Sequence, residues 1–261
     1  MALFFHELRQ NRLSLIIWSA ILSFVIAISV FIYPEMSSQM NEINDVFSQM
    51  GSFSDAFGMN ELNFGEFIGY FGVECGNSLG LGAAFFAAIL GVSALAKEQK
   101  DGTAEFLLTH PISRTTVVFQ KLLALIAELL ILNTAVFAVS VGSAAIIGET
   151  SDIPKMALIL LAQFLTQFEI AAVTFCVSAF IRRGGLGIGL GVAAVFYFLN
   201  ILANIDDSVE FLKYLTPFSF ADSAYIIENT ALDPAYLAIG ALVSAAAIAT
   251  AFLKYTKKDI L

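Results

Sequence analysis

Long apolar runs of this sequence contain the polar residues Glu128, Gln163, Gln167 and Glu169, and a third carboxyl, Glu74, falls nearer the predicted outer interface. Glu169 falls near the middle of its run. Glu128 follows Lys121 by nearly two helical turns, so these two side chains share one face of a helix. A charge at the centre of a bilayer costs about 2.5–3.5 kcal/mol on insertion scales, so such carboxyls must face a bundle interior or be protonated. They either line a polar pathway that responds to protons or ions, or join helices through hydrogen bonds.

Motifs for enzymes, metals or nucleic acids do not stand out elsewhere. No Gly-Lys dipeptide occurs, which leaves no phosphate-binding loop of the G-x-x-x-x-G-K kind. Two cysteines and two histidines are too few and too scattered for a metal site, and no Ser/His or Cys/His pair suggests a nucleophile. A net charge of −9 argues against nucleic acid. We therefore expect no catalysis, cofactor or metal in this chain.

The composition predicts a membrane protein. Of the 261 residues, 58% are hydrophobic and 13% are charged, whereas soluble domains carry about 25% charged residues. The fold class is then an all-α integral membrane protein with a single transmembrane domain, 1–261. The first apolar run exceeds a signal-peptide core of about 7–15 residues, and we expect Pro34 to end it. The six predicted spans are at about 13–33, 78–96, 117–147, 156–180, 186–203 and 235–253.

The positions of the cations predict the orientation. Of the 13 Lys and Arg residues, all but Lys155 and Lys213 fall on one proposed side of the membrane. Cytoplasmic loops carry the excess of Lys and Arg, so this side is the predicted cytoplasm, and an even number of spans returns both termini to it. The prolines are expected at or beyond helix ends, because proline lacks a backbone donor: Pro34, Pro111, Pro154, Pro217 and Pro234.

An amphipathic helix is predicted on the outer surface after the first span. Residues 35–66 contain several carboxylates and no Lys or Arg, and apolar residues recur within them at helical spacing: Met36, Met40, Ile43, Phe47 and Met50. This stripe either packs on the bundle or presents flexible methionine side chains to an apolar substrate. A shallow re-entrant segment from Phe67 is one option before the second span.

The polar loop between spans two and three has local structure of its own. Residues 104–109 can form a short helix, which Pro111 stops because the residue before proline avoids the helical region. Ser113 or Thr115 can then cap the third span. The short helix presents an apolar cluster, residues 106–108, that is either a docking surface or folds back onto the lipid headgroups.

The stretch KEQKDGTAEFLLTHPISRTTVVFQK, residues 97–121, resembles the loop of ABC-2 type transporter permeases. In that loop a Glu and a Gly-Thr precede a Leu pair, a proline, a Ser-Arg and a lysine. The stretches 214–227 and 255–260 resemble the last outer loop and the tail of the same family. Six spans, both termini inside and an amphipathic segment near the N-terminus also match, so the resemblance covers most of the chain.

The resemblance implies the permease subunit of an exporter in a bacterial cell membrane. In this family the loop forms a coupling helix that docks into a separate ATPase subunit, which binds ATP and Mg. Two permeases, identical or paralogous, join two ATPases in the membrane lipid. The closing outer helices correspond to residues of about 205–230. The implied coupling residues are Glu98, Asp101, Gly102, Thr103, Glu105, Phe106, Leu107, Leu108, Pro111 and Arg114.

Two other functions remain open at this point. An ion-coupled secondary transporter would use Glu128 and Glu169 as its ion or proton sites, but we find no clear internal inverted repeat. An intramembrane protease would need a Glu-Glu pair with nearby histidines, which is missing. The cargo of an exporter stays undetermined among antibiotic peptides, lipids and ions.

Overall fold

The structure, a computed structural model, describes residues 2–37, 51–57, 62–97, 102, 112–181 and 185–257. These residues form helices and no strand, which confirms the all-α prediction. Within this part of the chain, 6 helices are long and apolar enough to cross a membrane. They are α1 (Ala2–Ser37), a continuous helix over Phe67–Ala94, α8 (Arg114–Ile147), α9 (Ile153–Phe180), α10 (Leu186–Ile205) and α12 (Pro234–Thr256).

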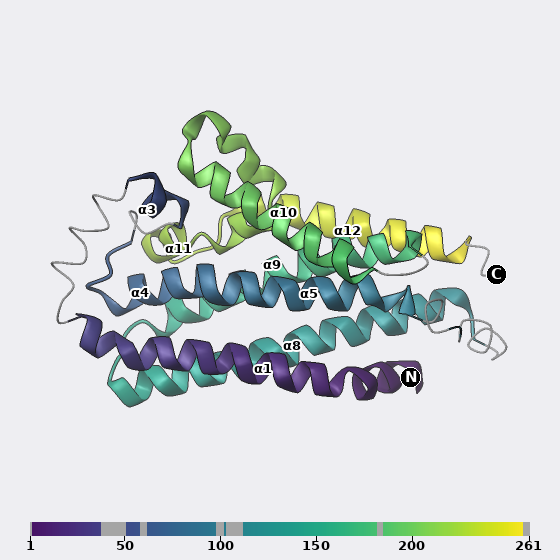
Figure 1. The fold of residues 1–261 in the computed structure, drawn as a ribbon, viewed down its shortest axis with the longest axis horizontal. Coiled ribbons are helices and arrows are strands. Elements are labelled where there is room, and N and C mark those ends of the chain that lie inside the picture. The colour runs from purple at the N-terminus through teal and green to yellow at the C-terminus, as the bar shows by residue number, and fades with distance from the viewer. Residues whose placement is uncertain are drawn as a thin grey trace.

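The long helices run side by side along one common axis except α10, which is inclined to it (Figure 1). The helix over Phe67–Ala94 and α9 form the centre of the bundle. α1 and α8 pack against each other on one side, whereas α10 and α12 pack on the other side, against the second span and α9 respectively. Both ends of the chain lie at the same end of the bundle, as an even number of crossings requires.

The central pair approaches closely at Gly91. A Cβ atom added to Gly91 would fall 2.5 Å from the carbonyl oxygen of Ala171 and closer still to the hydroxyl of Thr174, both on α9. Small residues let membrane helices approach until their backbones touch, which gains dispersion contacts that lipid cannot supply. Gly91 therefore sets the distance between the two central spans.

The first span is longer than predicted at both of its ends. α1 begins at Ala2 because the amide oxygen of Gln120 on α8 accepts hydrogen bonds from the backbone N–H groups of Leu3 (3.1 Å) and Phe4 (3.2 Å). This contact satisfies donors that a helix start leaves free. The prediction that Pro34 ends the span was wrong, since Pro34 lies inside α1. It sits in the last turn, where few hydrogen bonds remain to be lost.

The second span is continuous rather than preceded by a re-entrant segment. It consists of α4 (Phe67–Glu74), the π-helical segment η1 (Cys75–Leu79) and α5 (Gly80–Ala94). The prediction began the span at residue 78 because polar groups interrupt the apolar run there. The side chains of Asn77 and Ser78 bond to groups one turn earlier on the same helix, at Val73 and Glu74. Their polarity is therefore satisfied without breaking the helix.

The remaining spans begin where capping residues allow. Ser113 caps α8, its hydroxyl accepting from the backbone N–H of Thr116 at 3.1 Å, which confirms one of the two predicted caps. Pro154 and Pro234 lie in the first turns of α9 and α12, where proline is tolerated. Gly148 ends α8 in the left-handed region, with φ of 88°.

Short elements cover the end of the bundle away from the termini. They are α3 (Ser52–Ala56), the 3-10 helices η2 (Asp207–Leu215) and η3 (Pro217–Ala221), and α11 (Ser223–Asn229). The side chains of Asp206, Thr216 and Asp222 cap η2, η3 and α11 respectively. Apart from Met36, which belongs to α1, the residues of the predicted amphipathic outer helix lie outside the described residues.

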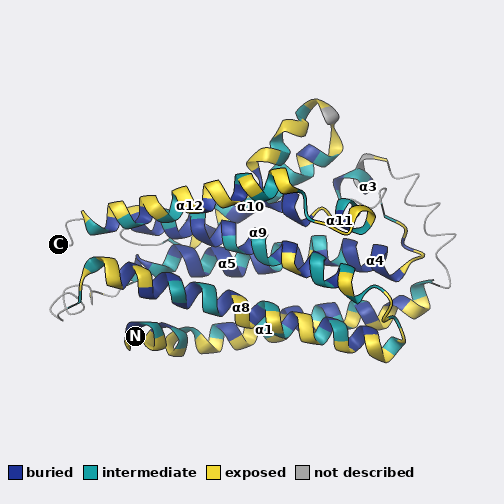
Figure 2. Ribbon diagram, turned by 180° about the vertical axis from the view of Figure 1, so that it is seen from behind, coloured by how far each residue is buried: buried dark blue, intermediate teal, exposed yellow. Residues whose placement is uncertain are grey.

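Exposed apolar side chains cover the outer faces of the bundle. Figure 2 shows long exposed stretches on α1, α10 and α12. Large examples on α1 are Phe24 and Leu13, and α12 exposes Leu242. Such faces suit a bilayer, where apolar side chains meet lipid tails instead of water.

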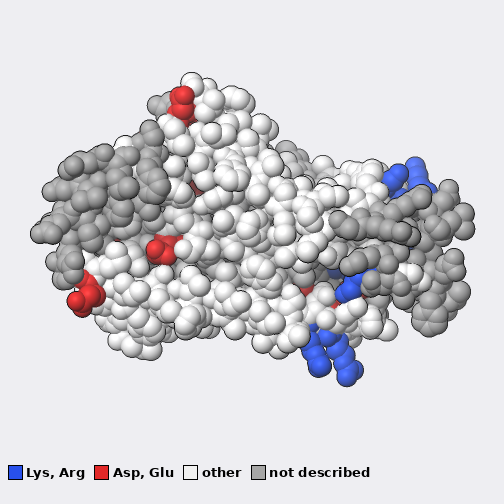
Figure 3. Space-filling model, in the orientation of Figure 1, with Lys and Arg blue, Asp and Glu red and all other residues white. Residues whose placement is uncertain are grey.

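Charges separate between the two ends of the bundle. On the face drawn in Figure 3, Lys and Arg gather at the end that holds both termini, and Asp and Glu mark the opposite end. We call these the basic end and the acidic end. Described cations at the basic end are Arg9, Arg12, Lys97, Arg114, Lys121, Lys254 and Lys257, and only Lys155 and Lys213 lie toward the acidic end among described residues. This is the asymmetry expected when the basic end faces the cytoplasm.

Candidate functional site

A buried polar network joins α1 to α8 near the basic end. Lys121 Nζ donates to Glu7 Oε1 at 2.7 Å, and this ion pair is almost fully enclosed, with side chains 1% and 7% exposed. One turn along α1, Asn11 Nδ2 donates to both carboxylate oxygens of Glu128, at 3.0 and 3.3 Å. Lys121 and Glu128 thus face the same neighbour, as their sequence spacing predicts.

The network extends to the root of the loop between spans two and three. Lys97, which follows the end of α5 at Ala94 after Leu95 and Ala96, donates from Nζ to Asn11 Oδ1 at 3.3 Å. The amide oxygen of Asn11 therefore accepts from Lys97, beyond the end of α5, and its amide nitrogen donates to Glu128 on α8. A single side chain of α1 connects the two helices that carry this loop.

A cavity of about 300 Å³ lies among these groups. We call it the basic-end cavity. Its polar wall contains Glu7, Asn11, Ser14, Ser93, Lys97, Lys121 and Glu128, and its apolar wall contains Ile89, Leu90, Val92, Leu125 and Leu186. The lining comes from α1, α5, α8 and the start of α10, so the cavity lies within one copy of the chain.

The other predicted intramembrane residues do not join this network. Gln167 forms a reciprocal amide pair with Asn133 on α8, with N–O distances of 2.6 and 3.2 Å. Gln163 is fully buried, and neither its amide oxygen nor its amide nitrogen has a hydrogen-bond partner among described residues. It lies beside Gly80, at the end of the π-helical segment.

Glu169 occupies a third environment, between α9 and α12. A Cβ added to Gly240 would fall 2.5 Å from Glu169 Oε2 and closer still to the ring of Phe220. Glu169 is 7% exposed. Its carboxyl receives no hydrogen bond from the part of the chain that the structure describes. The structure therefore places the four predicted polar residues in separate contacts rather than in one patch.

Three partners in these contacts were missed by the sequence reasoning: Glu7, Asn11 and Asn133. Glu7 and Asn11 were counted with the N-terminal segment before the first span, although their spacing of four residues places them on one helical face. Continuing that face to Ser14 and Trp18 would have indicated a helix that starts well before residue 13. Asn133 carried no comparable signal, because an amide in an apolar run reveals no partner.

Most of the predicted coupling residues lie outside the described residues: Glu98, Asp101, Thr103, Glu105, Phe106, Leu107, Leu108 and Pro111. Gly102 is exposed, and its φ of 69° lies in the left-handed region that favours glycine. Arg114 Nη1 donates to the carbonyl oxygen of Thr256 at 3.2 Å, in the last turn of α12. A cation there also complements the negative end of the helix dipole. Arg114 thus ties the start of α8 to the tail.

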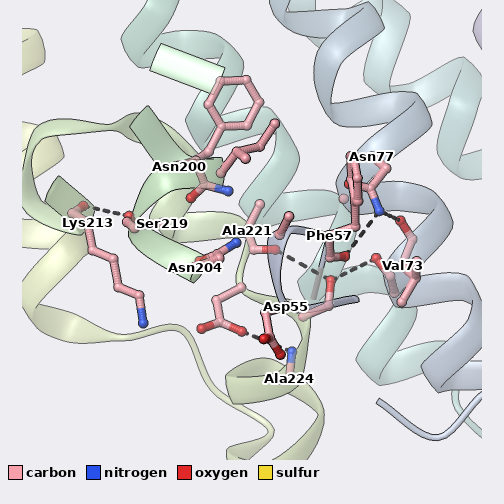
Figure 4. A pocket seen from close by; sticks show the side chains of 18 of the residues that line it. Asp55, Phe57, Val73, Asn77, Asn200, Asn204, Lys213, Ser219, Ala221 and Ala224 are labelled. Carbon is pink, nitrogen blue, oxygen red and sulfur yellow. Dashed lines mark hydrogen bonds between the residues drawn. The ribbon is translucent and has the colours of Figure 1, made fainter. Parts of the chain in front are cut away.

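A second cavity, of about 150 Å³, lies near the acidic end beneath α3 and η2. Figure 4 shows the amides of Asn200 and Asn204 beside Lys213, with Asn77 donating to the carbonyl oxygens of Phe57 and Val73. Nearby, hydrogen bonds from the backbone N–H and the hydroxyl of Ser208 lower the pKa of the exposed Asp206 below its usual value.

Metal and disulfide chemistry find no support among the described residues. No group of three or more His, Cys, Asp or Glu side chains there could hold a metal ion. Cys75 and Cys176 are both free thiols.

Comparison with known proteins gives one result. A family model described as "ABC-2 family transporter protein" matches residues 1–260. Neither the curated proteins nor the solved structures contain a match to this chain. The match covers nearly the whole sequence, so it includes every element described above.

Proposed function

This chain belongs to the ABC-2 family of transporters, and from this premise we propose that it is the permease subunit of an ATP-driven exporter in a bacterial cell membrane. The chain is a multi-pass membrane protein and a transport component, and its family is generally non-catalytic. In the proposal, ATP and Mg bind to a separate ATPase subunit, and two permease copies or paralogues assemble in the membrane. The observation that carries the proposal is the family match over residues 1–260.

The arrangement of the described residues supports a coupling role for the loop between α5 and α8. This loop leaves the bundle at the basic end, which the cation distribution assigns to the cytoplasm. Its two roots bond to other helices, Lys97 to Asn11 on α1 and Arg114 to the end of α12. Movement of the loop would therefore pull on α1 and α12 as well as on the two helices that carry it.

ATP can drive such movement only if the ATPase pair prefers one state of the permease. Closure of the ATPase pair on ATP would favour the permease state in which the two loops lie closer, so the differential affinity supplies the free energy. The apolar residues 106–108 would seat in the ATPase, surrounded by a polar rim that includes Glu98 and Asp101.

The test is co-purification of the tagged chain with an ATPase expressed from the same cells. Leu107→Asp or Phe106→Asp should abolish co-purification, because a carboxylate buried in an apolar interface loses its hydration. Phe211→Asp is the matched control: Phe211 is 60% exposed on η2 at the acidic end, and its substitution should leave co-purification unchanged. Retained ATPase binding in both loop variants would refute the assignment of this surface. Transport by the purified chain without an ATPase would refute the proposed function.

A further inference from the structure

The basic-end cavity combines the features of a site for an amphipathic molecule. One wall carries charged and amide groups, whereas the opposite wall is aliphatic. Its volume of about 300 Å³ lies at the lower end of the range of small-molecule pockets, about 300–1,000 Å³. It opens between four helices of one chain, so a ligand could occupy it without a second copy.

Glu128 is a carboxylate in the wall of this cavity that has unused hydrogen-bonding capacity and no ion-pair partner among the described residues. A carboxylate can accept about four hydrogen bonds, and in the described part of the chain only the amide of Asn11 donates to Glu128. Glu128 itself is 1% exposed, so bulk water does not reach it freely. Of the other charged groups in the wall, Lys121 is paired with Glu7 at 2.7 Å, and Lys97 donates to Asn11 Oδ1 at 3.3 Å. Glu128 therefore lacks a direct cationic donor among the described residues, and a ligand could supply one.

The apolar part of the site continues toward the centre of the bundle. Trp18 follows Ser14 by one turn on the cavity-facing side of α1, and its ring packs on Phe86 of α5 with 5.9 Å between the ring centroids. Phe86 precedes Ile89, which lines the cavity, by about one turn. The rise of a helix places Trp18 about 10 Å from Asn11 along the axis. A short alkyl chain with its head at Glu128 would end near this indole.

We propose that the basic-end cavity binds amphipathic amines, with the ammonium group at Glu128 and the alkyl body along Ile89 and Leu125 toward Trp18. The inference that these amines are the exported cargo rests on the proposed function, whereas their binding to the cavity does not depend on it. An ammonium group supplies the hydrogen-bond donors that Glu128 lacks, and it carries the opposite charge. An anionic amphiphile would meet the like charge of Glu128, and an alcohol would leave the charge unpaired.

The sequence provides its own reporter, because Trp18 is the single tryptophan. The purified chain, without any ATPase, is reconstituted in phosphatidylcholine nanodiscs and titrated with ω-bromooctylammonium, ω-bromooctanol and ω-bromooctanoate. Bromine quenches indole fluorescence on contact. Saturable quenching should appear with the amine at the lowest concentration. Equal or stronger binding of the carboxylate or the alcohol would overturn the proposal.

Two variants and a matched control assign the effect to the cavity. Glu128→Gln should weaken binding of the amine by about tenfold or more, since a buried charge partner is worth more than one decade of affinity. Glu169→Gln, a similarly buried carboxyl outside the cavity, should leave it unchanged. Ser93→Phe should fill the cavity and remove saturable quenching by amine and alcohol alike. Unchanged amine binding in Glu128→Gln, or an equal loss in Glu169→Gln, would overturn the site. Because no ATPase is present, this failure is distinct from loss of co-purification.

Discussion

Replacing Gln163 by methionine should stabilise the folded chain, although it removes a polar group from the centre of α9. Gln163 is 0% exposed, and both of its amide atoms lack partners among the described residues. A buried polar group without a partner costs about 1–3 kcal/mol. Methionine has a similar unbranched shape and no polar group to desolvate. We therefore expect the free energy of unfolding to rise by about 1–3 kcal/mol.

Gln167→Met is the matched control, one turn further along the same helix. Gln167 is equally buried, but it exchanges two hydrogen bonds with Asn133. The substitution leaves the Asn133 side chain without that partner. Hydrogen bonds between membrane helices contribute about 0.6 kcal/mol on average and about 1.7 kcal/mol at most. The free energy of unfolding of this variant should therefore fall by about 0.6–1.7 kcal/mol. The same change of residue thus has opposite signs at two positions.

The assay is reversible unfolding of the purified chain in mixed micelles, titrated with sodium dodecyl sulfate and followed by circular dichroism. If the unfolding free energy of both variants and of the original chain depends on the detergent concentration with the same slope, the substitutions have changed stability alone. The reasoning is refuted if Gln163→Met destabilises the chain as much as Gln167→Met does. That result would mean that the Gln163 amide is bonded in the folded protein.

Two further predictions use the same titration. Lys121→Met should lower the free energy of unfolding by about 3–5 kcal/mol, because it leaves the Glu7 carboxylate buried without its partner. The double variant Glu7→Leu, Lys121→Met should recover much of this loss. If the losses of the two single variants add up in the double variant, the pair does not interact. Gly240→Ala should cost about 1–3 kcal/mol by overpacking, since its Cβ would fall 2.5 Å from Glu169 Oε2 and even closer to the Phe220 ring. The cost should shrink when Phe220 is first replaced by leucine, and an unchanged cost would count against this contact.

The existence and order of the spans could be predicted because they depend on the length of apolar runs alone. Their ends could not, because partners from other helices determine them. Gln120 lies more than a hundred residues from Leu3, yet its side chain allows α1 to begin there. At the second span, hydrogen bonds within one helix satisfy Asn77 and Ser78, and a hydropathy profile counts such residues as breaks.

The candidate site was predicted in the same partial way. Depth in an apolar run identified Glu128 and Glu169 as buried, and the structure agrees. Which residues they meet depends on the rotation of each helix about its axis and on the choice of neighbours. Glu128 points to α1 and meets Asn11, whereas Glu169 meets Gly240 of α12 and Phe220 of η3. A single sequence carries no information on such pairings until the packing of the helices is known.

The separation of the two glutamates bears on the choice between an ATP-driven and an ion-coupled transporter. A carrier that uses both carboxyls for one ion needs them on a common path, within reach of one another. Glu128 lines the basic-end cavity, but Glu169 does not, and the Phe220 ring packs with it against Gly240. An ion at Glu128 would have to cross the packed centre of α9 to reach Glu169. The described residues therefore favour separate roles, with Glu128 available to a ligand and Glu169 holding α12 against α9. Glu169→Gln distinguishes the two functions when transport is measured, because it should abolish transport by an ion-coupled carrier and leave transport by an ATP-driven permease intact.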